Sequence, residues 1–223
     1  MSRFRKLFLT LGAVAVIACM SAQAQADTIT VVGADSGQFS TATVVCEFNS
    51  QTNTFTFTIT NTLAITQPGS TSTITSIGFD LPPVGNASSS GLNGFTGSQA
   101  PSLSSTFTFS DGNLGNVSHG FDDAVLDFGF ITGSNFSGGN PNLGLLPGES
   151  ASFTVSGAAF AGFTEAEICN AILVRFQNVP LEGGSEGSDV GSPGNPIPEP
   201  SSMLLLGSAL IGLGGYVRRR MKR

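Results

Sequence analysis

Apolar and polar side chains alternate with a period of two along much of this chain. The clearest example is 54–60, where Phe55, Phe57 and Ile59 alternate with four threonines. Because successive side chains of a strand point to opposite faces, this pattern predicts a strand with one buried face. Shorter alternations and β-branched runs predict seven further strands, at 28–32, 39–48, 71–80, 106–109, 125–130, 153–155 and 172–179.

Eight strands with Thr outward and apolar residues inward predict an all-β fold. We expect two packed antiparallel sheets, a β-sandwich of the jelly-roll or Ig-like kind, over residues 27–180. Sixteen Phe lie in this range, enough to build the core of one such domain. One short helix is also expected, because Thr164 and Glu167 have the spacing of a capping box and would open a helix that ends near Asn170.

Three stretches lack this periodicity. Residues 85–102 and 133–148 are rich in Gly, Ser and Asn, which predicts loops. Residues 181–196 combine acidic residues with Gly, Ser and Pro, which predicts a flexible acidic linker behind the sandwich.

The N-terminus has the three parts of a secretory signal. Basic residues before position 7 are followed by an apolar stretch at 7–20, and Ala24 and Ala26 then supply the small side chains that signal peptidase admits. The pattern predicts a signal peptide at 1–26 and a mature chain that begins at Asp27.

Two other interpretations of the N-terminus remain open. One is an uncleaved anchor helix, although the apolar stretch is short for a bilayer. The other is a lipoprotein signal in which Cys19 is acylated, because 16–19 loosely matches the sequence that precedes such a cysteine.

The C-terminus combines three features in a fixed order. Pro198, Glu199 and Pro200 are followed by an apolar run at 203–217, which as a helix is about 22 Å long and so shorter than the roughly 30 Å hydrocarbon core. A basic cluster then ends the chain and would stay on the cytoplasmic side. It consists of Arg218, Arg219, Arg220, Lys222 and Arg223. This pattern predicts a C-terminal hydrophobic helix that inserts transiently in the membrane, with an ordinary tail anchor as the alternative.

Together these features resemble the PEP-CTERM sorting family of Gram-negative bacteria, over about residues 196–223. The resemblance implies a sorting signal at 197–223 that is read by an exosortase, a membrane-embedded cysteine protease or transpeptidase, after export through the Sec translocon. It also implies an inner-membrane intermediate, then the cell surface or extracellular matrix, in hosts that usually make exopolysaccharide. Because the resemblance covers only the tail, it implies a route and not the activity of the body.

Charge is distributed very unevenly. Between 27 and 195 the only basic residue is Arg175, against fourteen acidic residues, a net charge of −13. No basic face is available to neutralise phosphates, which excludes a nucleic-acid binder. The same stretch has no Lys, Trp or Tyr, and its single His is His119.

Cys46 and Cys169 are the only cysteines left once residues 1–26 are removed. In an oxidising, exported context such a pair predicts a disulfide. Closing so long a loop would stabilise the fold by about 4–5 kcal/mol in the chain-entropy model. Two separate buried thiols are the alternative.

A catalytic site is not expected. Ser185 lies in a Gly-x-Ser-x-Gly match, but that motif needs a strand before it and a helix after it, and here it falls in the predicted linker. His119, between Ser118 and Gly120, is interpreted as a solvated loop residue. One His and a cystine leave too few ligands for zinc, so we predict no cofactor and no enzyme.

Calcium is the ion that the loops could best accept. The candidate ligands are Asp111, Asn113, Asp122 and Asp123, although the spacing is not that of an EF-hand. The PEP-CTERM resemblance, together with the missing catalytic residues, implies a non-enzymatic, exported surface or matrix protein with a structural or adhesive role in an exopolysaccharide or biofilm context. A Ca²⁺- or glycan-binding recognition module is the alternative, and it lacks the Trp and Tyr that secreted sugar-binding modules commonly use.

Overall fold

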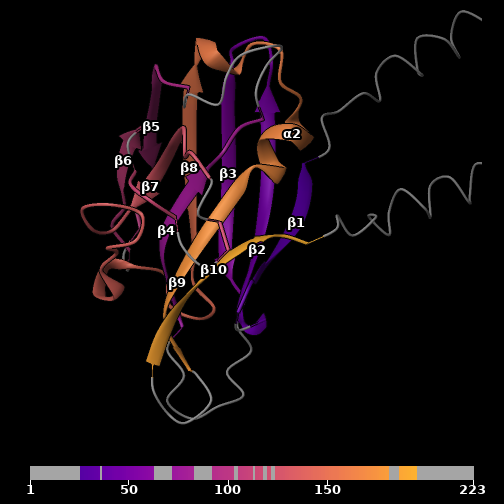
Figure 1. Ribbon diagram of the computed structural model, residues 1–223. Coiled ribbons are helices and arrows are strands. Elements are labelled where there is room, and N and C mark those ends of the chain that lie inside the picture. Colours follow the sequence, from indigo (N-terminus) through magenta and orange to yellow (C-terminus); the bar gives the residue numbers. More distant parts are fainter. Residues whose placement is uncertain are drawn as a thin grey trace, which may run out of the picture.

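The computed structural model describes residues 26–35, 37–62, 72–82, 92–102, 105–112, 114–117, 120–121, 124–180 and 186–194 (Figure 1). The strands are β1 (Asp27–Gly33), β2 (Gly37–Asn49), β3 (Thr54–Asn61), β4 (Thr73–Phe79), β5 (Phe95–Gln99), β6 (Thr108–Asp111), β7 (Phe128–Ile131), β8 (Ser150–Gly157), β9 (Ile172–Pro180) and β10 (Glu186–Pro193). The helical elements are the 3₁₀ turns η1 (Pro141–Leu143) and η2 (Ala158–Phe160) and the helix α2 (Glu165–Asn170).

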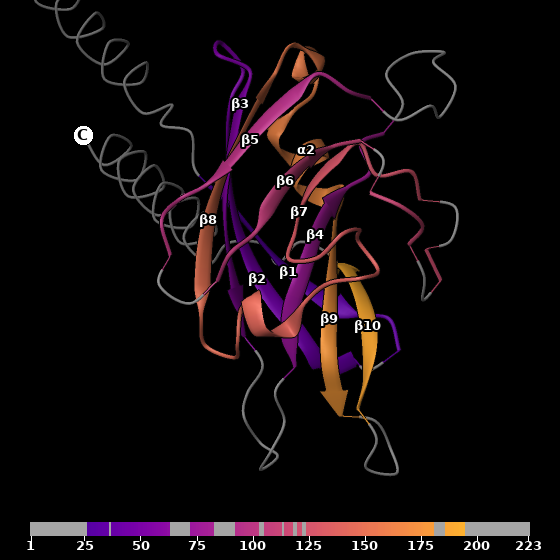
Figure 2. The same cartoon turned by 90° about the vertical axis from the view of Figure 1, so that its left-hand side faces the viewer.

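The ten strands of the described residues form one sheet, in the order β5-β8-β3-β2-β1-β10-β9-β4-β7-β6, with antiparallel neighbours. The sheet curls until its two edge strands, β5 and β6, lie beside each other, which makes it nearly barrel-shaped (Figure 2). The prediction of an all-β, antiparallel fold with little helix is therefore confirmed.

The fold differs from the predicted two-sheet sandwich because of β10. The predicted flexible linker at 181–196 is wrong for Glu186–Pro193, because these residues form a strand that pairs with β9 on one side and β1 on the other. β10 and β1 thereby join the two halves that would otherwise be separate sheets. The result is one continuous sheet whose halves face each other.

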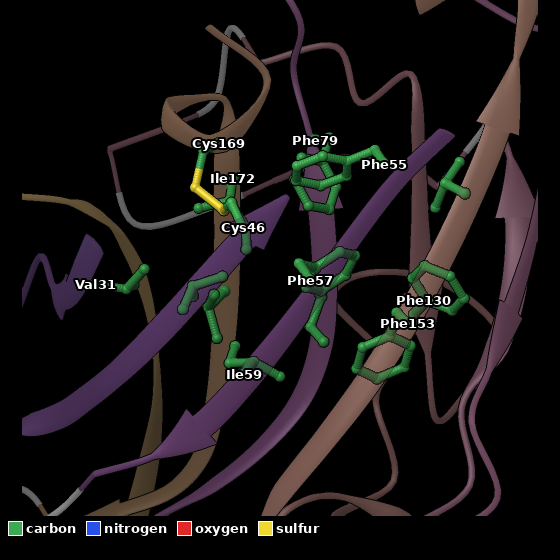
Figure 3. Packing of buried hydrophobic residues seen from close by; sticks show 14 of the residues in the cluster. Val31, Cys46, Phe55, Phe57, Ile59, Phe79, Phe130, Phe153, Cys169 and Ile172 are labelled. Atoms are coloured by element: carbon green, nitrogen blue, oxygen red, sulfur yellow. A yellow bond between two sulfur atoms is a disulfide. The ribbon is translucent and has the colours of Figure 1, made fainter. Parts of the chain in front are cut away.

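The core consists of Phe rings that meet between these halves. Phe57 on β3 stacks on Phe153 of β8 with ring centroids 5.0 Å apart. Its ring centroid also lies 5.2 Å from that of Phe79 on β4 and 6.0 Å from that of Phe130 on β7 (Figure 3). Phe57 itself is 1% exposed, so the alternation of β3 does bury the face that the sequence predicts.

A second apolar layer covers the outside of β4, whose residues are all buried. It is formed mainly by the segment between β6 and β8 together with outward side chains of β9 and β10. Its buried members are Leu114, Val117, Leu126, Ile131, Phe136, Leu173 and Val190. This part of the sheet is therefore covered on both faces, whereas β3 and β8 present polar side chains outward.

Those polar side chains form a regular pattern of hydroxyl pairs between β3 and β8. Thr58 and Ser152 lie 2.7 Å apart, as do Thr60 and Ser150, and the pairs Thr54–Ser156 and Thr56–Thr154 continue the series at 3.1 and 3.5 Å. Each hydroxyl can donate and accept, so paired hydroxyls remain able to bond water or another hydroxyl-bearing molecule. The outer face of these two strands is thus uncharged and rich in hydroxyl groups.

Side chains hold the edge strands β5 and β6 together at a junction that we call the β5–β6 junction. The Asp111 carboxylate accepts from the backbone N–H groups of Gly94, at 2.9 Å, and Phe95, at 3.1 Å. At the other end of β5, the Gln99 side chain accepts from the N–H of Phe107 at 2.8 Å. At the centre of the β5–β6 junction there is no room for a side chain on Gly97, because a Cβ there would lie 2.2 Å from the Phe109 ring.

The other sequence predictions can be compared element by element. All eight predicted strands are present, and the predicted loop at 133–148 contains turns, η1 and a single antiparallel bridge between Leu145 and Ile74. The predicted loop at 85–102 was wrong in part, because 95–99 form β5. The helix after Thr164 has the predicted capping box with Glu167. The predicted C-terminal helix lies outside the described residues.

Candidate functional site

The described chain begins and ends in neighbouring strands. β1 starts at Asp27, directly after the predicted signal-peptidase site at Ala26. β10 ends at Pro193 opposite Val31, and the N–H of Gly194 then donates to the Thr30 carbonyl at 2.9 Å. Both predicted processing regions therefore adjoin the same end of the β1–β10 pair.

The helix α2 is attached to this end by a disulfide. Cys46 on β2 and Cys169 on α2 are bonded, with their Cα atoms 6.2 Å apart, which confirms the predicted pairing (Figure 3). Both cysteines are 1% exposed. Because Cys46 lies opposite Asp27 in the β1–β2 pair, the disulfide places α2 beside the start of β1.

Glu165, in the first turn of α2, links the helix to both strands. Its Oε2 atom accepts from the N–H of Phe48 at 2.7 Å, and its Oε1 atom accepts from the N–H of Asp27 at 3.3 Å. The capping box fixes the backbone of the same turn, since the Glu167 carboxylate accepts from the N–H and hydroxyl of Thr164, each at 2.8 Å. These two bonds lower the pKa of Glu167.

A cleft of about 410 Å³ lies between α2 and the end of β4. It is lined by Asp80, Pro82, Ala166, Glu167, Asn170 and Ala171. The N–H of Asp80 donates to the Ala171 carbonyl at 3.0 Å, and this bond holds the two walls in place. Two carboxylates and one amide above small apolar side chains are groups that can bond the hydroxyls of a sugar or the water of a hydrated cation.

Asp80, which is half-buried in the wall of this cleft, interacts electrostatically with a second acid, the buried Asp127. Burial raises the pKa of Asp80, partly opposed by a hydrogen bond from the backbone of Val125. Burial also raises the pKa of Asp127, which is 3% exposed, and the charge of Asp80 adds to this rise. The Asp127 carboxylate accepts from the N–H of Leu81, at 2.7 Å, and of Leu92, so its role is to hold both ends of the segment between them.

The single basic residue of the body is also buried. Arg175 is 7% exposed on β9, and its Nη2 atom donates to the hydroxyl of Ser188 on β10 at 3.0 Å. Desolvation lowers the pKa of this guanidinium. The cleft and the hydroxyl-rich face of β3 and β8 are two polar features that the described part of the chain offers to a ligand.

Of the four predicted calcium ligands, Asp111 is the one that lies in the described residues. Both oxygens of Asp111 accept backbone N–H groups at the β5–β6 junction. Asn113, Asp122 and Asp123 lie outside the described residues, as does His119. Among the residues that the structure does describe, no three His, Cys, Asp or Glu side chains are grouped closely enough to hold a metal ion.

The processing and sorting residues lie outside the described ranges as well, except Ala26. They are Cys19, Ala24, Pro198, Glu199, Pro200, Arg218, Arg219, Arg220, Lys222 and Arg223. Ser185, the centre of the Gly-x-Ser-x-Gly match, also lies outside the described residues. In the ranges that are described, none of the helices has the length and apolar character needed to cross a bilayer.

Comparison with known families identifies the C-terminal segment. Residues 196–220 match the model of the PEP-CTERM protein-sorting motif. This motif marks the chain as an exported protein that is targeted to exosortase and sorted to the cell surface. No curated protein and no solved structure shows significant similarity to the chain.

Sequence reasoning missed the cleft and the paired acids Asp80 and Asp127. Asp80 follows a strand and Asp127 precedes one, and an Asp at either position is ordinary for a turn. The sequence around these residues therefore gave no signal of a site. The cleft arises only because β4 ends against a helix that begins about 85 residues later in the chain. The capping box at Thr164 was the one local signal that marked a wall of the site.

Proposed function

We propose that this protein is a non-enzymatic structural or adhesive component of the surface or extracellular matrix of a Gram-negative bacterium. It is exported through the Sec translocon, held briefly in the inner membrane by residues 203–217, and released when exosortase processes the tail. The observation that carries this proposal is the PEP-CTERM motif at 196–220, joined to a folded domain with almost no intervening chain.

The surface chemistry of the domain supports a matrix role. The hydroxyl pairs of β3 and β8 form an uncharged polar face, and a hydrated neutral polymer can exchange hydrogen bonds with such a face without leaving a buried charge unpaired. The disulfide between Cys46 and Cys169 suits an oxidising environment outside the cytoplasm.

The intact mass of the protein purified from its native host tests the processing route. The expected chain begins at Asp27, ends beyond Gly194, lacks 203–217 and gains about two mass units on reduction of one disulfide. A chain that retains the basic C-terminus would mean an ordinary membrane anchor and would contradict the proposal.

Fractionation tests the matrix role separately. The protein is expected to sediment with the exopolysaccharide fraction and to move to the soluble medium in a strain that makes no exopolysaccharide. The control is the same chain truncated after Gly194 and secreted by the same host, which reports whether sorting or binding decides the location. Equal distribution in both strains would refute an adhesive role in the polysaccharide.

The cleft favours a second candidate, a glycan- or Ca²⁺-binding recognition module. A ligand that bonds the cleft residues Asp80 and Asn170 should raise the midpoint of thermal unfolding, since ligands that bind only the folded state stabilise it. Host oligosaccharides and millimolar Ca²⁺ are the probes, Asn170→Ala is the test variant, and Glu47→Ala, which alters an exposed carboxylate on β2, is the control. The absence of any shift would leave only the structural role.

A further inference from the structure

We propose that the α-ammonium group created by signal-peptide cleavage binds Glu165, so that processing itself completes an ion-pair site between β1 and α2. The proposal rests on the proposed export and on cleavage after Ala26. Its first support is the position of β1, which starts at Asp27. The predicted cleavage site and the first residue of the sheet therefore coincide.

The second support is the position of the Asp27 nitrogen. It lies 3.3 Å from Oε1 of Glu165, a long hydrogen bond for a backbone amide. Cleavage turns this same atom into an ammonium group with three donors and a full positive charge. A long amide–carboxylate contact thus becomes a charge-assisted one, and the backbone need not move.

The third support is that the Glu165 carboxylate is held in place before the ammonium arrives. Its other oxygen accepts from the N–H of Phe48 at 2.7 Å. The disulfide between Cys46 and Cys169 fixes the far end of α2, and the capping box fixes its first turn. A preorganised carboxylate loses little side-chain entropy when it binds the ammonium.

The electrostatic surroundings favour the charged form of the N-terminus. The ionisable groups on β1, β2, α2 and the end of β4 near this site are all acidic: the side chain of Asp27 itself, Glu47, Asp80, Glu165 and Glu167. An opposite charge nearby stabilises an ammonium, so the pKa of the Asp27 amino group should lie above the ordinary 7.7–8.0 of an α-amine.

The absence of lysine makes this site chemically unique. Lysine occurs only at positions 6 and 222, so a chain that has lost both the signal peptide and the tail has a single primary amine, the one on Asp27. Any amine-directed modification of the processed protein, such as acylation or condensation with an aldehyde, can therefore occur at this one atom. The ion pair with Glu165 keeps that atom protonated and lowers its reactivity at neutral pH.

The experiment measures the rate at which an amine-specific acetylating reagent modifies the secreted protein from the native host, followed by intact mass across pH 6–10. One added acetyl group is expected, with a midpoint above the ordinary range. In Glu165→Gln the midpoint should fall and the rate near pH 7 should rise about 2- to 5-fold, which is the size expected for a partly exposed ion pair. The control Glu149→Gln, which alters a carboxylate just before β8 that accepts from the N–H of Leu146, should leave both unchanged.

Three outcomes would overturn the proposal, and they can be told apart. A mature chain that starts elsewhere than Asp27, or that is acylated at Cys19, refutes the cleavage on which both this site and the export route depend. A chain that starts at Asp27 but has the same midpoint in wild type and Glu165→Gln refutes the ion pair alone. If Glu165→Gln is not secreted, the pH midpoint of acetylation of the wild-type protein is the test. A midpoint within the ordinary range of an α-amine that does not change between low and high salt contradicts the ion pair with Glu165.

Discussion

The β5–β6 junction offers a direct test of how the curled sheet is kept closed. The two edge strands meet through side chains, and Asp111 supplies two of the bonds, to the N–H groups of Gly94 and Phe95. The change Asp111→Ala removes both acceptors and leaves the strands otherwise intact. We expect it to open this junction locally without unfolding the rest of the domain.

The size of the effect follows from the two contacts. A hydrogen bond to a charged acceptor contributes about 1.5–3 kcal/mol when it is shielded from water. Gly94 and Asp111 are exposed, so water can replace part of this, and about 1–2 kcal/mol in total is the expected loss. The ring of Phe95 still packs on Phe128 and Phe160, with centroids 4.7 and 4.8 Å away, and so retains β5 in the core.

Hydrogen exchange provides the assay, because it reports local opening at single amides. The exchange rates of the Gly94 and Phe95 amides should rise about 5- to 30-fold in Asp111→Ala, the factor that corresponds to 1–2 kcal/mol. The amides of β2 should exchange as before, and Glu47→Ala provides a control for the loss of an exposed carboxylate. Unchanged rates at Gly94 and Phe95 would refute the view that Asp111 closes the sheet.

Four further predictions concern the core, the disulfide, Asp80 and β10. Phe57→Ala should lower the free energy of unfolding by about 3–5 kcal/mol, measured by chemical denaturation, and Phe57→Leu by clearly less, because the ring lies among four others. Replacing Cys46 and Cys169 together by Ala should cost about 4–5 kcal/mol if chain entropy dominates, and an unchanged denaturation midpoint would contradict this. Since burial raises the pKa of Asp80, the folded protein holds this proton more tightly than the unfolded chain. The contribution of Asp80 to stability should therefore be greatest below the ordinary value of 3.8 and be lost as the pH rises through the raised value, and Asp80→Asn should remove this pH dependence from a series of thermal unfolding midpoints. A chain truncated after Gly194 should show one cooperative unfolding transition, whereas truncation before β10 should abolish it or cause aggregation, as light scattering would show.

The strands that could be predicted are those whose side chains bury one face by themselves. In β3 the alternation of Phe55, Phe57 and Ile59 with threonines is a local property, and the structure buries those three side chains. The same holds for the capping box of α2, which needs only Thr164 and Glu167. Where the residues that determine a strand or a helix start are close together in the sequence, their spacing was sufficient to predict that element.

The two strands that were missed owe their conformation to distant partners. β5 has one buried apolar side chain, Phe95, and its far end is held by the polar bonds of Gln99, so its Gly- and Ser-rich sequence resembled a loop. β10 has a composition typical of a linker, yet it lies between β1 and β9 and buries Asp189 and Val190. Pairing on both sides outweighed low intrinsic β-propensity there.

The cleft could not be predicted for a related reason. Its walls come from the end of β4 and from α2, and they meet through one backbone bond between Asp80 and Ala171. No periodicity links two such segments. The disulfide could be predicted from the number of cysteines. The position of α2 beside the start of β1 could not, because it depends on the strand register that sets Cys46 opposite Asp27.

The position of β10 also constrains how the protein is processed. Pro198 follows Gly194 by four residues, which span at most about 14 Å when fully extended, so the sorting motif begins close to the sheet. A cut within or after the motif leaves β10 paired, whereas a cut upstream of Gly194 would separate the two halves of the sheet.

The cleft beside α2 lies at the same end of the domain as the sorting motif, because Glu165 of α2 contacts Asp27. On the proposed route, in which residues 203–217 are held in the membrane, this end of the domain is the one nearest the bilayer. We expect removal of the tail to make the cleft accessible, so that a ligand which binds there should bind the released protein more strongly than the membrane-held precursor.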